Sequence, residues 1–118
     1  MDTYHVRRGF ETVATESAGT TGTAKSDAAD SVRETIREAG GETFESVTAE
    51  AADVYEFPAG PFDPYRITVR GTVTVTVESD DETSAVETGR QLIEDRLTAA
   101  RLDGWEYTDE ATVVTAGE

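Results

Sequence analysis

Residues 65–79, which read YRITVRGTVTVTVES, constrain the fold more than any other stretch. Apolar and polar residues alternate along it, and the side chains of a β-strand point alternately to its two faces. The pattern therefore predicts one long strand with a buried apolar face and a polar face of Thr and Arg. Gly71 falls in the middle of the apolar face, where a bulge or bend is expected.

An earlier stretch, YHVRRGFETVATES at residues 4–17, shares several residues with this strand. Its apolar positions change phase around Gly9, which predicts a one-residue bulge. Each of the two similar strands precedes a helix signal and then a strand opened by an aromatic residue. We interpret the chain as one domain of two duplicated halves, about 3–57 and 65–116, joined by a proline-rich connection at 58–64.

Two helices are expected between the strands. Ser26 or Asp27 is the expected N-cap of the first, and Gly40-Gly41 ends it. The acidic run at 79–82 predicts the N-terminus of the second, which continues to about Arg101. The remaining strands are expected at 42–57, with an irregular middle, and at 105–116.

This element order predicts an α+β fold, a two-layer α/β sandwich of ferredoxin-like βαββαβ order. Such a fold has a four-stranded antiparallel sheet with both helices on one face. The two similar strands lie side by side in its centre. The other face of the sheet is open, and Thr and Arg line it.

Acidic residues dominate the charge: 25 Asp and Glu face 10 Lys and Arg, and the net charge is −15. The acids are scattered along the chain, which is typical of a solvated surface. This acid-rich composition, with Lys25 as the only lysine, resembles that of small cytoplasmic proteins of haloarchaea. In molar salt the Debye length falls to about 3 Å, so surface acids scarcely repel each other. An acidic mesophilic protein and an acidic binder of basic partners are the alternatives.

Several classes of site and location are not expected. The chain has no Cys and only one His, His5, so Cys-ligated and His-cluster metal sites are excluded. No Ser-His-Asp set is available, and the spacing of the acids selects no catalytic pair, so we expect neither an enzyme nor a cofactor. The sequence contains no apolar run of about 18 residues and no secretory signal, which predicts a cytoplasmic protein without a membrane partner.

The segment GTTGTAKS, residues 19–26, resembles the P-loop in the spacing of its glycines and of Lys25 and Ser26. It departs from that motif at Ala24, where the family has Gly. The resemblance implies an anion or nucleotide bound at Lys25 and Ser26. The simpler interpretation is a polar connection.

The segment RGFETV, residues 8–13, resembles part of the signature of RNA-recognition motifs. In that family the signature lies on the third strand and carries aromatic residues that stack on bases. The third strand here has Thr at those positions, and the net charge opposes binding to a phosphate backbone. Nucleic acid is therefore not an expected partner.

Cationic residues gather on the two central strands of the predicted sheet. Arg66, Arg70, His5 and either Arg7 or Arg8, with Arg8 selected, are expected to share the open face. Arg binds carboxylate and phosphate through a planar fork, so this group predicts an anion site or a docking surface. The alternative is cross-strand pairing with Glu11, Glu78 or acids of a partner subunit.

The proline-rich connection carries Phe62, which is interpreted either as an interface residue or as part of a lid over the core. Taken together, the sequence predicts a non-enzymatic module that self-associates through its open face or its edge strands. Arg70 and Phe62 are the expected interface residues. A protein or a small anionic ligand is the expected further partner.

Overall fold

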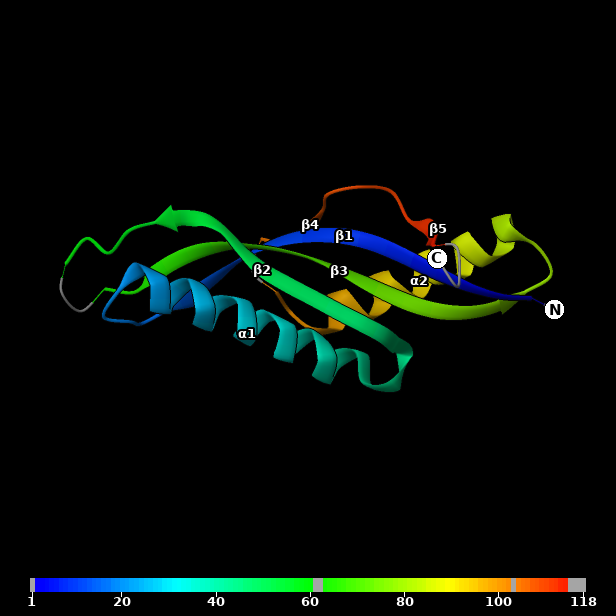
Figure 1. The fold of residues 1–118 in the computed structure, drawn as a ribbon, viewed down its shortest axis with the longest axis horizontal. Coiled ribbons are helices and arrows are strands. Elements are labelled where there is room, and N and C mark those ends of the chain that lie inside the picture. Colours follow the sequence, from blue (N-terminus) through cyan, green and yellow to red (C-terminus); the bar gives the residue numbers. More distant parts are fainter. Residues whose placement is uncertain (1, 61–62, 103, 115–118) are drawn as a thin grey trace.

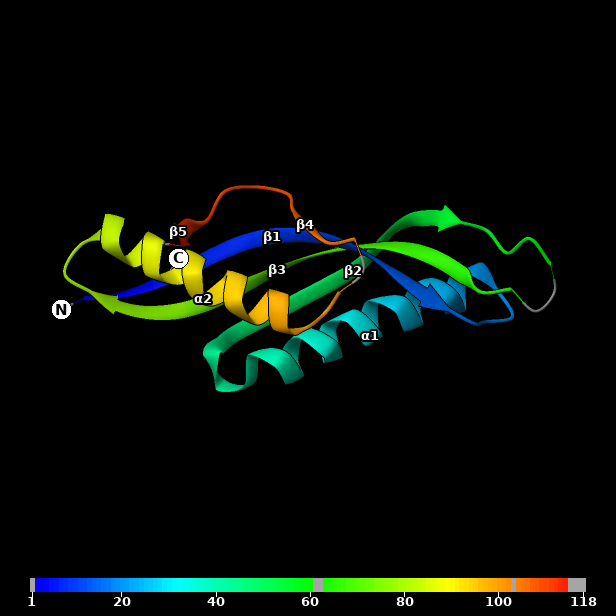
Figure 2. The same cartoon turned by 180° about the vertical axis from the view of Figure 1, so that it is seen from behind.

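The computed structural model describes residues 2–60, 63–102 and 104–114. The elements in chain order are β1 (Asp2–Glu16), α1 (Thr21–Gly40), the short 3₁₀ helix η1 (Gly41–Thr43), β2 (Phe44–Glu56), β3 (Tyr65–Ser79), α2 (Glu82–Ala99), β4 (Glu106–Tyr107) and β5 (Thr112–Val114). The strands form one antiparallel sheet in the order β2-β3-β1-β4, with β5 also paired to β1. The predicted α+β fold with two helices is therefore confirmed. The molecule is elongated, with α1 along β2 and α2 along β1 and β3 (Figures 1 and 2).

The two similar strands lie side by side in the centre, as predicted. β1 and β3 are paired over fifteen positions, from Asp2↔Ser79 to Glu16↔Tyr65, without a shift. The predicted bulge at Gly9 is therefore wrong. Tyr4, Val6 and Phe10 all lie on the inner side of the sheet, the side that the helices cover, and the apparent change of phase arises because Val13 lies on the opposite side.

Gly71 serves close packing rather than a bulge, because its pairing with Phe10 is in register. A Cβ atom at this position would lie 1.9 Å from the carbonyl oxygen of Thr48 and 2.9 Å from Cζ of Phe10. The irregularity predicted for 42–57 is confirmed in β2, whose pairing with β3 shifts at three places.

The last strand differs from the prediction of one strand over 105–116. Tyr107 is paired with Phe10 and Thr112 with Arg7, so the four residues 108–111 stand opposite only Arg8 and Gly9. We call residues 108–111 the arch, and it is visible between β4 and β5 in Figure 1. The described residues thus form five strands, and the prediction of a regular four-stranded ferredoxin-like sheet is corrected. Residues 115 and 116 lie outside the described part.

Helix α1 begins earlier than predicted. The side chain of Thr20 accepts a hydrogen bond from the backbone N–H of Thr23, so Thr20 is the N-cap in place of Ser26 or Asp27. The predicted C-terminus is correct, since Gly41 follows the helix with φ of 54°. Asp81, within the predicted acidic run, caps α2 by accepting from the backbone N–H of Ser84 at 2.7 Å.

The core lies between the inner side of the sheet and the two helices. Its fully buried large side chains include Val6, Phe10, Ile36, Ile67, Val69, Val73, Val75, Ile93 and Leu97. Gly89 lets α2 approach β1 closely, because a Cβ atom there would lie 2.5 Å from Cβ of Val6. This packing leaves the opposite side of the sheet without a covering element among the described residues.

Candidate functional site

We call this uncovered side the open face. Strand register places on it every second residue of the central strands and the matching residues of β2. Its members include His5, Arg7, Glu11, Val13 and Thr15 of β1, Arg66, Thr68, Arg70, Thr72, Thr74 and Thr76 of β3, and Thr48, Glu50, Asp53 and Glu56 of β2. The structure thus places His5, Arg66 and Arg70 on one face, as predicted. They are spread along it, because His5 pairs with Thr76, which is ten residues from Arg66 along β3.

The side chains of Arg66, Arg70 and His5 already contact carboxylates of other strands. Arg70 Nε donates to Glu11 Oε2 at 2.7 Å. Arg66 Nη1 lies 3.5 Å from Glu56 Oε2. His5 Nδ1 lies 3.0 Å from Glu45 Oε2. The predicted alternative of cross-strand pairing therefore holds for Glu11, whereas none of the described cations contacts Glu78.

The hydrogen bond from Arg70 to Glu11 and the charge of Glu11 raise the pKa of the Arg70 guanidinium. Arg66 has a second partner, because its Cζ lies 5.1 Å above the ring of Tyr55. The guanidinium groups of Arg66 and Arg70 are thus held by their own chain, and a free anion would have to compete with their carboxylate partners.

Arg8 does not belong to this group, and its prediction as an anion ligand of the open face is corrected. Neighbouring residues of a strand face opposite sides, so Arg7 lies on the open face and Arg8 on the inner side. The Arg8 side chain is only 12% exposed. Its Cζ lies 3.4 Å from the ring centre of Tyr107, and its Nε donates to the carbonyl oxygen of Asp109 at 2.9 Å. Arg8 therefore fastens the arch to β1.

Arg7 is the cation that the prediction passed over. It is exposed and stands beside Thr74 of β3 and Thr112 of β5. No residue of the described ranges forms a hydrogen bond or an ion pair with its side chain. Arg7 is thus the open-face Arg whose fork is free.

A shallow depression of about 320 Å³ lies where β2 meets β3. Thr48, Glu50, Arg70 and Thr72 are among its lining residues. The hydroxyls of Thr48 and Thr72 are 2.8 Å apart, and the backbone N–H of Thr72 donates to Thr48 Oγ1. Thr48 was missed from the sequence because the register shifts of β2 hide which of its residues face outward.

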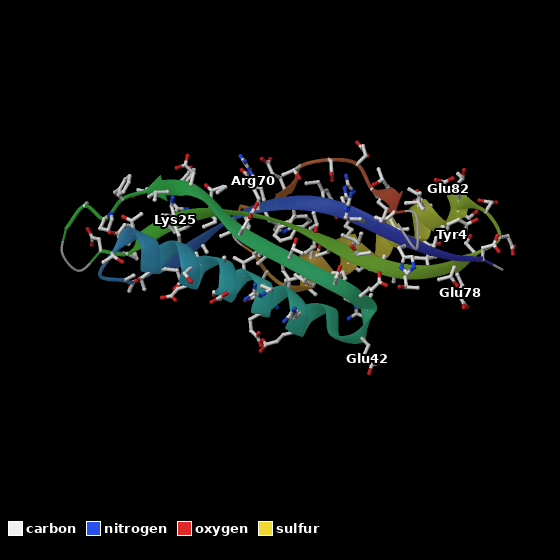
Figure 3. All side chains as sticks on the ribbon, viewed as in Figure 1. Tyr4, Lys25, Glu42, Arg70, Glu78 and Glu82 are labelled. Atoms are coloured by element: carbon white, nitrogen blue, oxygen red, sulfur yellow. The ribbon has the colours of Figure 1, made fainter. Side chains whose placement is uncertain are left out.

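Lys25 and Ser26, the predicted anion ligands, lie in a helix rather than in a loop. Residues 21–26 belong to the first turns of α1, and the N–H of Ala24 donates to the carbonyl oxygen of Thr20. Residues 21–26 of the P-loop-like segment therefore start a helix instead of forming a phosphate-wrapping loop, and anion binding at Lys25 and Ser26 stays a prediction. Figure 3 shows Lys25 on α1 and Arg70 on the sheet.

The predicted interface residue Phe62 lies outside the described residues. Nearby, Tyr55 and Phe57 are exposed at 60% and 64%. The ring of Phe57 contacts that of Tyr65 edge-on at 6.3 Å. Aromatic surface is therefore present where β2 ends, next to the charged pairs of the open face.

The described ranges hold no group of three His, Asp or Glu side chains that could bind a metal ion. None of the helices seen in this structure is both long and apolar enough to cross a membrane. Comparison with models of protein families and with curated proteins finds no match. The function must therefore be argued from the open face itself.

Proposed function

We propose that this protein is a non-enzymatic binding module of a halophilic cytoplasm, and that it self-associates through the open face of its sheet. The observation that carries the proposal is the local charge balance of this face. Molar salt screens the net charge of −15 beyond about 3 Å, but acids in direct contact across an interface still repel each other, so contact is least unfavourable where cations offset the acids. The pairs Arg70–Glu11 and Arg66–Glu56 provide that balance.

The same face also carries free groups of both signs. Within the described ranges, the side chain of Arg7 forms no hydrogen bond or ion pair, and Glu50 of β2 forms no ion pair. In a two-fold interface a patch of one subunit contacts the same patch of the other. An ion pair between Arg7 of one subunit and Glu50 of the other would therefore form twice. The 56 × 28 Å outline of the molecule leaves room for the roughly 800 Å² per subunit of a standard interface.

The test compares two charge reversals. Arg70→Glu places two acids against each other on the open face, and we expect it to lower the mass of the assembly. Arg33→Glu is the matched control, because Arg33 also pairs with an acid, Asp30, but lies on α1. Light scattering behind a sizing column in molar KCl measures both. A monomeric wild type, or equal masses of the two variants, would refute the proposal.

A small anionic ligand is the second candidate, and the free fork of Arg7 favours it. Phosphate titrated into the protein would then shift the amide resonances around Arg7 and Thr74. Arg7→Gln should abolish those shifts. Unchanged spectra at millimolar phosphate would exclude this site.

A further inference from the structure

The outer edge of β1 is only partly covered. On one side, β3 accompanies β1 over its whole length. On the other side, β5 is paired with residues 5–7 and β4 with Phe10 and Glu11. No strand of the described residues accompanies Val13–Glu16 on this side.

The arch shows which backbone groups point to that edge. The N–H of Gly9 donates to Asp109 Oδ1 at 2.7 Å, and its carbonyl oxygen accepts from the N–H of Thr108. Gly9 thus directs its N–H and its C=O to the outer edge of β1. Successive residues of a strand direct these two groups to opposite edges. Val13 and Thr15 therefore direct their N–H and C=O groups to the free edge, whereas Ala14 and Glu16 direct theirs to β3.

This edge lacks the features that protect edge strands from pairing. The opposite edge of the sheet, β2, has three register shifts and several acids, among them Glu50 and Asp53, and both features discourage a further strand. The segment Val13–Thr15 is uncharged, contains no proline and keeps its register with β3. On the inner side, a depression of about 240 Å³ separates it from α1.

We propose that Val13–Thr15 pairs in antiparallel fashion with the same segment of a second copy, around a two-fold axis at Ala14. Val13 then lies opposite Thr15 of the second copy, and the two pairs form four backbone hydrogen bonds. An axis at Val13 would collide with β4, which occupies the position beside Glu11. An axis at Thr15 would need Ser17, which lies beyond the end of β1.

Charge supports this register. Glu16 and Arg101 both line the depression beside the edge. In the register centred on Ala14, Glu16 lies opposite Thr12 of the second copy, on the side where Arg101 of that copy enters the same depression. Each copy therefore offers an acid to the other's Arg101. This contact uses groups different from those of the open face, so it adds a second contact to the proposed self-association, and each can be lost alone.

Amide hydrogen exchange, resolved by residue in the wild-type protein, tests the pairing directly. The amides of Val13 and Thr15 have no partner within the described part of one chain, so we expect pairing to slow their exchange at least about tenfold relative to an open edge. Ala14 and Glu16 are internal controls, because β3 protects them in any case. Unprotected amides at Val13 and Thr15 at the highest protein concentration would overturn the inference.

A matched pair of proline variants gives the second test. Thr15→Pro removes an outward N–H and leaves the pairing with β3 intact, since proline is tolerated where a strand edge faces outward. Thr3→Pro makes the same change in the same strand, outside the proposed contact. We expect Thr15→Pro alone to halve the mass of the assembly, as measured by light scattering in molar KCl.

The outcomes separate the two contacts. If Thr15→Pro leaves the mass unchanged while Arg70→Glu lowers it, the edge pairing fails and the open-face contact stands. If Thr15→Pro lowers the mass while Arg70→Glu leaves it unchanged, the edge pairing stands and the open-face contact fails. A monomeric wild type with unprotected Val13 and Thr15 amides overturns both.

Discussion

Replacing Gly71 with alanine is expected to push β2 away from the centre of the sheet. Gly71 lies where β3 passes between Phe10 of β1 and the backbone of β2. The new Cβ atom would stand 1.9 Å from the carbonyl oxygen of Thr48, far inside contact distance. A backbone atom cannot rotate away as a side chain can, so the β2 strand itself would have to move.

Two effects of opposite sign decide how much Gly71→Ala changes the free energy of unfolding. Alanine is favoured over glycine within a strand by roughly 0.5–1 kcal/mol, because glycine loses more backbone freedom on folding. Overpacking of a close-packed region costs about 1–3 kcal/mol, and more when the backbone is displaced. The contact at Gly71 involves backbone, so the upper end applies, and we expect a net loss of about 2 kcal/mol in the free energy of unfolding.

Urea unfolding in molar KCl, followed by circular dichroism, measures this loss as a lower midpoint with an unchanged slope. Gly22→Ala is the matched control, because no atom lies within 4 Å of a Cβ at Gly22 and the residue is helical. That variant should gain up to about 1 kcal/mol. A Gly71→Ala protein as stable as the wild type would refute the packing argument.

Four further predictions concern a core residue, two side chains with shifted pKa values (Tyr107 and Asp81) and the acidic surface. Ile93 is fully buried, so Ile93→Ala should lower the free energy of unfolding by about 2–5 kcal/mol in the same urea assay. The hydroxyl of Tyr107 is buried without a hydrogen-bond partner in the described ranges, and burial raises its pKa above the ordinary 10.0. Stability should therefore fall as the pH rises beyond 10, and Tyr107→Phe should remove that part of the loss while keeping the stability at pH 7. The hydrogen bond from Ser84 lowers the pKa of Asp81 below its ordinary 3.8, so the stability it contributes is lost as the pH falls through the lowered value. Asp81→Ala should flatten this acid limb of a pH titration of the melting temperature. Dialysis from molar to about 0.05 M KCl, where the Debye length exceeds 10 Å, should lower the melting temperature, and an unchanged value would contradict the halophilic interpretation.

The central strands were predictable because their physical signal is local. Alternation along 65–79 fixes a strand with one buried face, and its similarity to 4–17 correctly suggested that the two lie together. The start of α1 was missed because its Thr- and Gly-rich first turn has the composition of a loop. The hydrogen bonds from the N–H groups of Thr23 and Ala24 to Thr20 show where this helix begins.

The open face was predicted in outline, but its free cation was not. Arg7 and Arg8 are adjacent in sequence, and the choice between them depends on the phase of β1. Val6 and Phe10 are buried on the same side as Arg8 and indicate the correct phase, whereas Val13 lies on the open face and suggests a different phase after Gly9. The stacking of Arg8 on Tyr107 depends on the break between β4 and β5. No pattern in residues 105–116 predicts that break.

The arch also determines how this chain can change in length. Four residues stand opposite two, so the pairing on its far side is displaced by two positions. Because two is the period of a strand, Tyr107 and Val113 still face the core together. Insertions or deletions of two residues in the arch would preserve that arrangement, whereas one residue would turn Val113 outward. This edge of the sheet can therefore accept changes of length in steps of two.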